Sequence, residues 1–102
     1  MPTSPEGLIP AARSALVGTA IDFEGDSIKF QTIAGPTVYT IVNTILDRII
    51  TLELDGIFAV TLPGTVDVVN GDYCPNLGVN YLMLHCIDDA APAYLGTWTT
   101  GV

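Results

Sequence analysis

The sequence predicts an all-β protein, a small barrel or sandwich of about six to eight short strands that follows an extended N-terminal arm. From Leu16 onward the chain is rich in Thr, Val, Ile and Tyr, the residue types that favour strands. Turn-forming residues interrupt these stretches at short intervals. Because 102 residues suffice for one modest core, we expect an arm over residues 1–14 and one β-rich domain with a C-terminal tail over residues 15–102.

Three prolines shape the predicted arm. Pro2, Pro5 and Pro10 each fix φ, lack an amide donor and bias the preceding residue away from helix. A segment of this kind rarely packs on its own domain. We therefore expect the arm to contact a neighbouring subunit through Leu8 and Ile9.

The first strands are predicted on either side of short turns. Residues 19–23 alternate Thr, Ile and Phe with Ala and Asp, as a strand does. Glu24-Gly25-Asp26 then supplies a turn before a second strand over residues 27–33. These two strands are predicted to form a hairpin. A turn at residues 34–37 then leads to a third strand over residues 38–43.

The later strands are predicted from β-branched content and turn residues. Residues 44–54 fit a strand better than a helix because of their many β-branched residues. Short strands should follow over residues 57–62, before Pro63-Gly64, and over residues 65–69. The clearest late strand, residues 79–87, has one face with Tyr81, Met83 and His85 and another with Leu82, Leu84 and Cys86. Since both faces are largely apolar, we expect both to be covered.

The tail carries three candidate contact residues, Tyr94, Leu95 and Trp98. The segment is predicted to be either a last edge strand or an extended tail. Tyr94 and Trp98 share a face in an extended chain. They either complete the core or anchor a contact with another subunit, where Tyr and Trp are enriched.

The composition excludes several classes of partner. The chain is 49% hydrophobic and only 14% charged, against about 25% charged in a typical domain, so we expect burial against partner chains. The net charge is −8, and the three cations, Arg13, Lys29 and Arg48, are scattered, which disfavours nucleic acid and anionic membrane surfaces. No apolar run approaches the about 18 residues of a membrane span, and the first residues lack the features of a signal peptide.

The residues give no sign of an enzyme or of a cofactor. His85 and Cys86 are adjacent, but neighbours on a strand point to opposite faces and cannot readily pair as base and nucleophile. With Cys74 they are too few for a structural zinc site. Without a signal peptide, the two cysteines are more typical of reduced thiols than of a disulfide, although geometry decides.

The acidic run Asp22, Glu24 and Asp26 is superficially similar to a calcium loop. An EF-hand also requires Gly at its sixth position and Glu at its twelfth, where this chain has Ser27 and Ile33. A solvated turn is therefore expected, and no metal.

The segment from Gly25 to Leu62 resembles a recurring β-hairpin pattern of tailed-bacteriophage virion proteins. In that pattern a strand after Gly-Asp leads to an Ile-Ala-Gly turn, a Tyr-Thr-Val strand and a Thr-Leu-Thr-Leu strand. The matching residues are Gly25-Asp26, Ile33-Ala34-Gly35, Tyr39-Thr40-Ile41 and Ile50-Thr51-Leu52. The chain departs from the pattern at Asp47-Arg48, where small residues are usual, and the segment covers little more than a third of the sequence.

The resemblance implies a β-barrel or sandwich built into a virus particle, without specifying the component. The acidic charge, the scarcity of lysine and the proline-bearing arm are compatible with a capsid cement or decoration protein that clamps neighbouring capsid subunits. Its partners would be the major capsid protein or other virion subunits, at the capsid surface of a virion assembled in the host cytoplasm. A head-to-tail connector or a tail component is one alternative. From the residues themselves we also expect a homo-oligomer, for example a trimer. A different class of function, a monomeric β-barrel module that binds a small ligand or carbohydrate on Trp98 and Tyr94, stays open.

Overall fold

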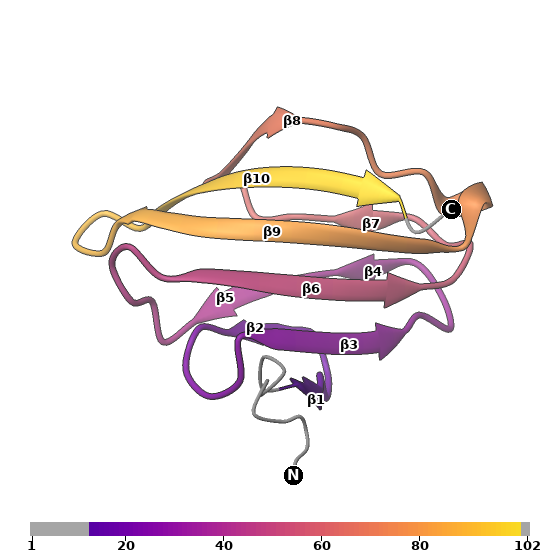
Figure 1. Ribbon diagram of the computed structural model, residues 1–102, viewed down its shortest axis with the longest axis horizontal. Coiled ribbons are helices and arrows are strands. Elements are labelled where there is room, and N and C mark those ends of the chain that lie inside the picture. The colour runs from indigo at the N-terminus through magenta and orange to yellow at the C-terminus, as the bar shows by residue number, and fades with distance from the viewer. Residues whose placement is uncertain (1–12, 101–102) are drawn as a thin grey trace, which may run out of the picture.

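The computed structural model describes residues 13–100, which form a two-layered β-sandwich (Figure 1). The larger layer is a six-stranded sheet in the order β1-β3-β6-β9-β10-β8, and the smaller layer consists of the pairs β2-β5 and β4-β7. The strands are β1 (Arg13–Ala15), β2 (Ala20–Asp22), β3 (Ile28–Thr32), β4 (Thr37–Val38), β5 (Thr40–Val42), β6 (Ile49–Asp55), β7 (Val60–Thr61), β8 (Val66–Asn70), β9 (Val79–Asp88) and β10 (Ala93–Thr100), with a short 3-10 helix, η1 (Pro75–Leu77), before β9. The all-β class is confirmed, and the described residues hold ten short strands.

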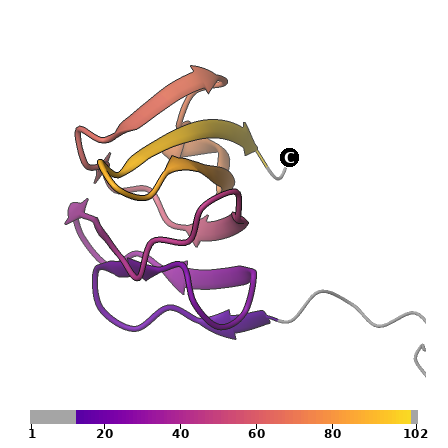
Figure 2. The ribbon, with the colours of Figure 1, turned by 90° about the vertical axis from the view of Figure 1, so that its left-hand side faces the viewer.

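The first half of the domain is a stack of parallel strands. β3 pairs in parallel with β6, and β4 pairs in parallel with β7. Ile28 lies opposite Thr51 and Thr37 lies opposite Val60, so both pairs join residues 23 positions apart. The turn from β3 to β4 therefore stacks in register on the turn from β6 to β7. Figure 2 shows the chain rising through this stack broadly in sequence order.

The core lies between the two layers. Its buried apolar residues are Leu16, Ile21, Phe23, Ile33, Tyr39, Ile50, Leu52, Leu54, Leu82, Leu84, Cys86, Tyr94 and Trp98. The rings of Phe23 and Tyr94 meet across the layers with their centroids 5.2 Å apart. Burial alternates along β6 and β9, as the two-residue period of a strand requires.

The hairpin predicted around Gly25 is wrong. β2 pairs with β5, whereas β3 pairs with β1 and β6, so the two strands belong to different layers. Two cations hold the connecting loop: Nζ of Lys29 donates to the carbonyl of Glu24 at 2.9 Å, and Nη2 of Arg48 donates to the carbonyl of Gly25. Gly25, with a φ of 76°, does turn the chain, but a turn residue does not determine which strands pair.

Several strand limits also differ from the prediction. The strand predicted over residues 44–54 begins only at Ile49, and the one predicted over residues 38–43 is interrupted at Tyr39. Arg13, predicted in the arm, already belongs to β1 and pairs with Ile28. The tail forms β10, which is not an edge strand because β9 and β8 flank it on its two sides.

Candidate interaction surface

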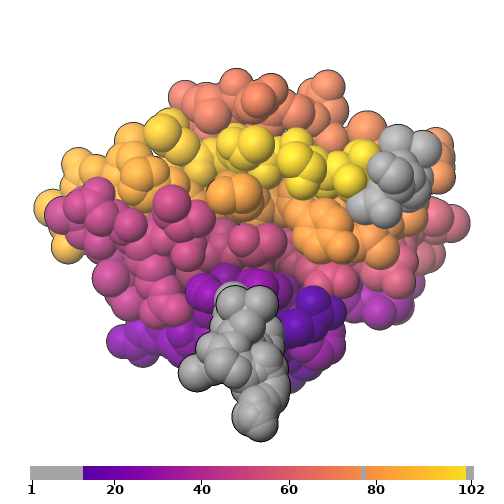
Figure 3. Space-filling view, viewed as in Figure 1, coloured from indigo at the N-terminus to yellow at the C-terminus, as the bar shows by residue number. Residues whose placement is uncertain are grey.

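The outward face of the six-stranded sheet faces the viewer in Figures 1 and 3 and is only partly covered in the described part of the chain. Along β9, Leu82, Leu84 and Cys86 are buried, whereas Met83 and Ile87 are each 45% exposed. Among the described residues only the inner face of this strand is fully covered, and a cover for the outward face stays a prediction. The inner face packs against the smaller layer, and the outward face offers apolar side chains to solvent.

Three large apolar side chains of similar exposure lie on this face of β6 and β9, and Leu46 lies in the turn beside β9. We call this set the end patch: Leu46, Ile49, Met83 and Ile87, each 45–47% exposed. His85 lies opposite Ile49 in the pairing of β6 with β9 and opposite Leu95 in the pairing of β9 with β10. Directly opposite residues share a face of the sheet. His85 and the half-buried Leu95 therefore extend the end patch across three strands.

The turn before β6 brings Leu46 and Asp47 beside β9. The amide of Asp47 donates to the carbonyl of Cys86 at 2.9 Å, and the amide of Cys86 donates to the carbonyl of Arg48 at 3.1 Å. Asp47 has a positive φ of 66°, which Asp tolerates better than most residues. In Figure 3 this turn and the turn between β9 and β10 lie together at the left of the molecule.

Carboxylates border the end patch. The side chain of Asp47 is 80% exposed. Asp88 and Asp89, both exposed, follow Ile87 directly at the end of β9. Asp67 on β8 lies opposite Leu95. The apolar surface thus has an acidic border on the side of the turns and on the side of β8.

The basic side chains of the protein are engaged elsewhere. Arg13 forms an ion pair with Glu53, and Lys29 is buried in the loop contact with Glu24. Arg48 follows Asp47 in sequence, but its guanidinium turns away to the carbonyl of Gly25. Since these are all three Lys and Arg residues of the chain, the acidic border has no basic counterpart of its own.

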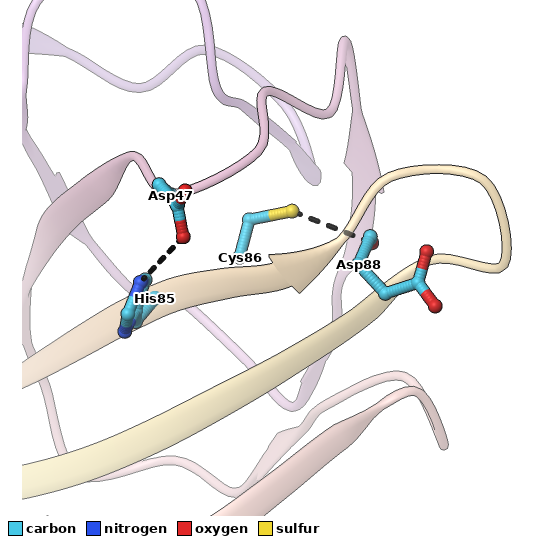
Figure 4. A network of polar contacts seen from close by, with 4 residues as sticks. All are labelled: Asp47, His85, Cys86 and Asp88. Atoms are coloured by element: carbon cyan, nitrogen blue, oxygen red, sulfur yellow. Dashed lines mark hydrogen bonds and ion pairs between the residues drawn. The ribbon is translucent and has the colours of Figure 1, made fainter.

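His85 and Cys86 do not form a base and nucleophile pair. Figure 4 shows Nε2 of His85 directed toward Oδ1 of Asp47 at 3.7 Å, while Sγ of Cys86 donates to the carbonyl of Asp88 at 3.4 Å. Burial raises the pKa of the Cys86 thiol, with smaller contributions from nearby carboxylates. A thiol held in its protonated form is a poor nucleophile. Cys86 is therefore a core side chain.

The structure separates the residues predicted to make contacts. Tyr94 and Trp98 are only 2% and 6% exposed, so of the two alternatives they complete the core and do not present a surface for a subunit contact. Their burial also removes the stacking platform of a carbohydrate-binding module. Leu95 lies beside the end patch, where its contact stays a prediction. Leu8 and Ile9 lie outside the described residues.

Oxygen atoms of the acidic loop after β2 accept hydrogen bonds from donors of the protein itself. Oδ1 of Asp22 accepts the amide of Glu24 at 2.8 Å and Nδ2 of Asn43 at 3.0 Å, and these bonds lower the pKa of Asp22. The carbonyls of Glu24 and Gly25 accept the two cations described above. Over residues 13–100, no group of three or more His, Cys, Asp or Glu is placed to hold a metal ion.

The two cysteines are both free thiols. The amide of Cys74 donates to Oδ1 of Asn80 at 2.9 Å, near the start of β9. Cys86 lies six residues further along this extended strand, about 20 Å from Asn80. A disulfide requires Cα atoms within about 7 Å, so this fold cannot bridge Cys74 and Cys86.

Comparisons with known proteins give no match: no protein-family model, no curated protein and no solved structure matches this chain. In the part of the chain that the structure describes, no helix is long and apolar enough to cross a membrane.

Proposed function

We propose that this protein is a non-enzymatic structural subunit that works by assembling with other proteins. The observation that carries the proposal is the end patch, in which Ile49, Met83 and Ile87 are exposed on one face of a sheet and Leu46 is exposed in the adjoining turn. Clustered apolar side chains at a surface mark interaction sites, whereas single exposed ones do not. The high apolar content and low charge of the chain support the same interpretation.

The assembly that we propose is the particle of a tailed bacteriophage. The support is the resemblance of residues 25–62 to virion proteins, together with the all-β fold. In this proposal the protein is a capsid cement or decoration protein that clamps neighbouring capsid subunits at the capsid surface. A head-to-tail connector or a tail component would also need an apolar docking surface and is the second candidate.

Self-association is a further part of the proposal, with a trimer as the expected form. β8 is an outer strand of the six-stranded sheet, and its Val68 and Val69 are 42% and 56% exposed. An outer strand can pair with a strand of another subunit through main-chain hydrogen bonds. We therefore assign contacts between copies to the edge of β8 and contacts with other virion subunits to the end patch.

Light scattering over a range of protein concentrations tests the self-association. The expected result is a stable oligomer that the Val69→Lys variant reduces to a monomer, because a lysine on an outer strand opposes pairing. Val38→Lys is the matched control, since Val38 is 64% exposed on β4 of the other layer. A monomer at every concentration would contradict the homo-oligomer, and an equal effect of both variants would contradict the assignment to β8.

A further inference from the structure

We infer that the end patch takes a partner protein whose surface presents apolar side chains bordered by lysine or arginine, and does not take a second copy of this chain. The inference rests on the proposed function, because it specifies the chemistry of the partner that this surface binds. Three observations carry it: the acidic border, the engagement of the protein's own cations, and the apolar centre.

The acidic border opposes a contact between two copies. Asp47, Asp88 and Asp89 lie together at the turns that flank the end patch, in a protein of net charge −8. A symmetric contact through this surface would bring these carboxylates against their own copies. Like charges brought together at an interface are strongly unfavourable.

The cations of a second copy are already engaged in contacts of their own. Nη1 of Arg13 binds Glu53, and its guanidinium lies 4.6 Å from the centre of the Phe30 ring. Lys29 is only 6% exposed, and Arg48 is bound to a loop carbonyl. To present any of them at the end patch, the partner copy would have to break these contacts. A different protein, with its own Lys or Arg, meets the acidic border without that cost.

The apolar side chains of the end patch contribute most of the binding affinity, and the acidic border orients the partner as it approaches. Met83 lies between Thr51 and Thr97 across the sheet, and an unbranched Met side chain adapts readily to different partners. Burial of the apolar side chains removes them from water. Charge pairs at the border guide the approach, and dissolved salt screens them. Binding at the end patch should therefore weaken, but persist in part, as the salt concentration rises.

A short peptide of sequence KLVKLVK is the probe for this chemistry, and ELVELVE is its acidic counterpart. The full chain, with its methyl groups labelled for NMR, is titrated with each peptide. The expected result is that KLVKLVK shifts the methyl signals of Ile49, Met83, Ile87 and Leu95 and that ELVELVE does not. Shifts confined to other parts of the protein, or equal shifts with both peptides, would overturn the inference.

Two double variants separate the end patch from the general acidity of the protein. Asp47→Asn with Asp89→Asn removes two border charges, and Asn also tolerates the positive φ of residue 47. Asp55→Asn with Asp72→Asn removes two exposed charges elsewhere and leaves the same net charge. We expect the border variant to bind KLVKLVK about threefold or more weakly and the control to bind as the parent does. Equal affinities of the two variants would show that only net charge matters, against the inference.

The titration distinguishes this inference from the proposed function. A chain that is a monomer in light scattering yet binds KLVKLVK at the end patch would contradict the homo-oligomer and support the inference. An oligomer whose mass falls in Met83→Lys but not in Val69→Lys would show that copies meet through the end patch, and would overturn the inference while leaving assembly itself supported.

Discussion

The hydroxyl of Tyr39 donates a hydrogen bond to Oε1 of Gln31 and so ties the smaller layer to the six-stranded sheet. Nε2 of Gln31 in turn donates to the carbonyl of Leu16 at 3.1 Å and to the carbonyl of Gly18 at 2.8 Å. One amide side chain therefore satisfies the hydroxyl of a residue that is 1% exposed and fixes the chain that leaves β1. Gln31 lies on the inner face of β3, opposite the buried Leu54, although alternation in the sequence would place the apolar Ile28 and Phe30 on that face.

Replacement of Gln31 by Leu should lower the free energy of unfolding by about 1–3 kcal/mol, because the Tyr39 hydroxyl and two carbonyls lose their partner. Urea denaturation followed by Trp98 fluorescence measures the loss. Thr32→Val is the control, since Thr32 is the next residue of β3 and is exposed. It should change the stability by less than about 0.5 kcal/mol. An equal loss in both variants would contradict a structural role for this hydrogen-bonded amide.

The same tyrosine should make the protein sensitive to alkali. Burial, with a smaller repulsion from Tyr73, raises the pKa of Tyr39 to about 12, against about 10 in an unfolded chain. Between these values the unfolded state has released the proton and the folded state retains it, so stability falls as the pH rises. Tyr39→Phe should lose less stability than the parent over this window. Denaturation curves recorded at several pH values test this. An equal decrease in the free energy of unfolding of the parent and of Tyr39→Phe would contradict it.

The strands were largely predictable, but their pairing was not. The sequence of residues 79–87 identifies β9 as a strand and sorts its side chains onto two faces, because the period of a strand is visible in the sequence, but it does not tell which face is buried. The parallel stack left no such mark: inward Leu52 of β6 lies opposite inward Lys29 of β3. Because paired positions of these stacked strands carry different residue types, the stack produces no repeat that can be recognised in the sequence. Gly25 favoured a hairpin, whereas β2 pairs with β5 and β3 pairs with β1 and β6.

The end patch was predictable only in part. The sequence of residues 79–87 shows that the outward face of β9 is apolar, and this led us to expect that other residues bury it. The described residues do not. Leu46 and Ile49 come from a segment more than thirty residues earlier in the sequence. They reach β9 because Asp47 and Arg48 form main-chain hydrogen bonds with Cys86. Such a contact between distant segments has no local signal.

The in-register stack can be tested at two glycines in equivalent turns. Gly56 has a φ of 151°, and a Cβ added there would lie 2.8 Å from the carbonyl oxygen of Ile33, the residue 23 positions earlier. A Cβ at Gly35, in the turn after β3, meets no atom within 4 Å. Gly56→Ala should therefore cost about 1–3 kcal/mol of stability, and Gly35→Ala should cost little. Thermal or urea unfolding compares the two, and equal stabilities would contradict the close stacking of the turns.

The two thiols should differ sharply in reactivity in the folded protein. Cys74 is half-buried, whereas Cys86 is fully buried and burial raises its pKa. Iodoacetamide reacts with the thiolate, so mass spectrometry should find one modified cysteine in the native chain and two in the urea-unfolded chain. The Cys74→Ser variant should remain unmodified until it unfolds. Rapid modification of Cys86 in the native protein would contradict its place in the core, and a failure of both cysteines to react after unfolding would reveal a disulfide that this fold forbids.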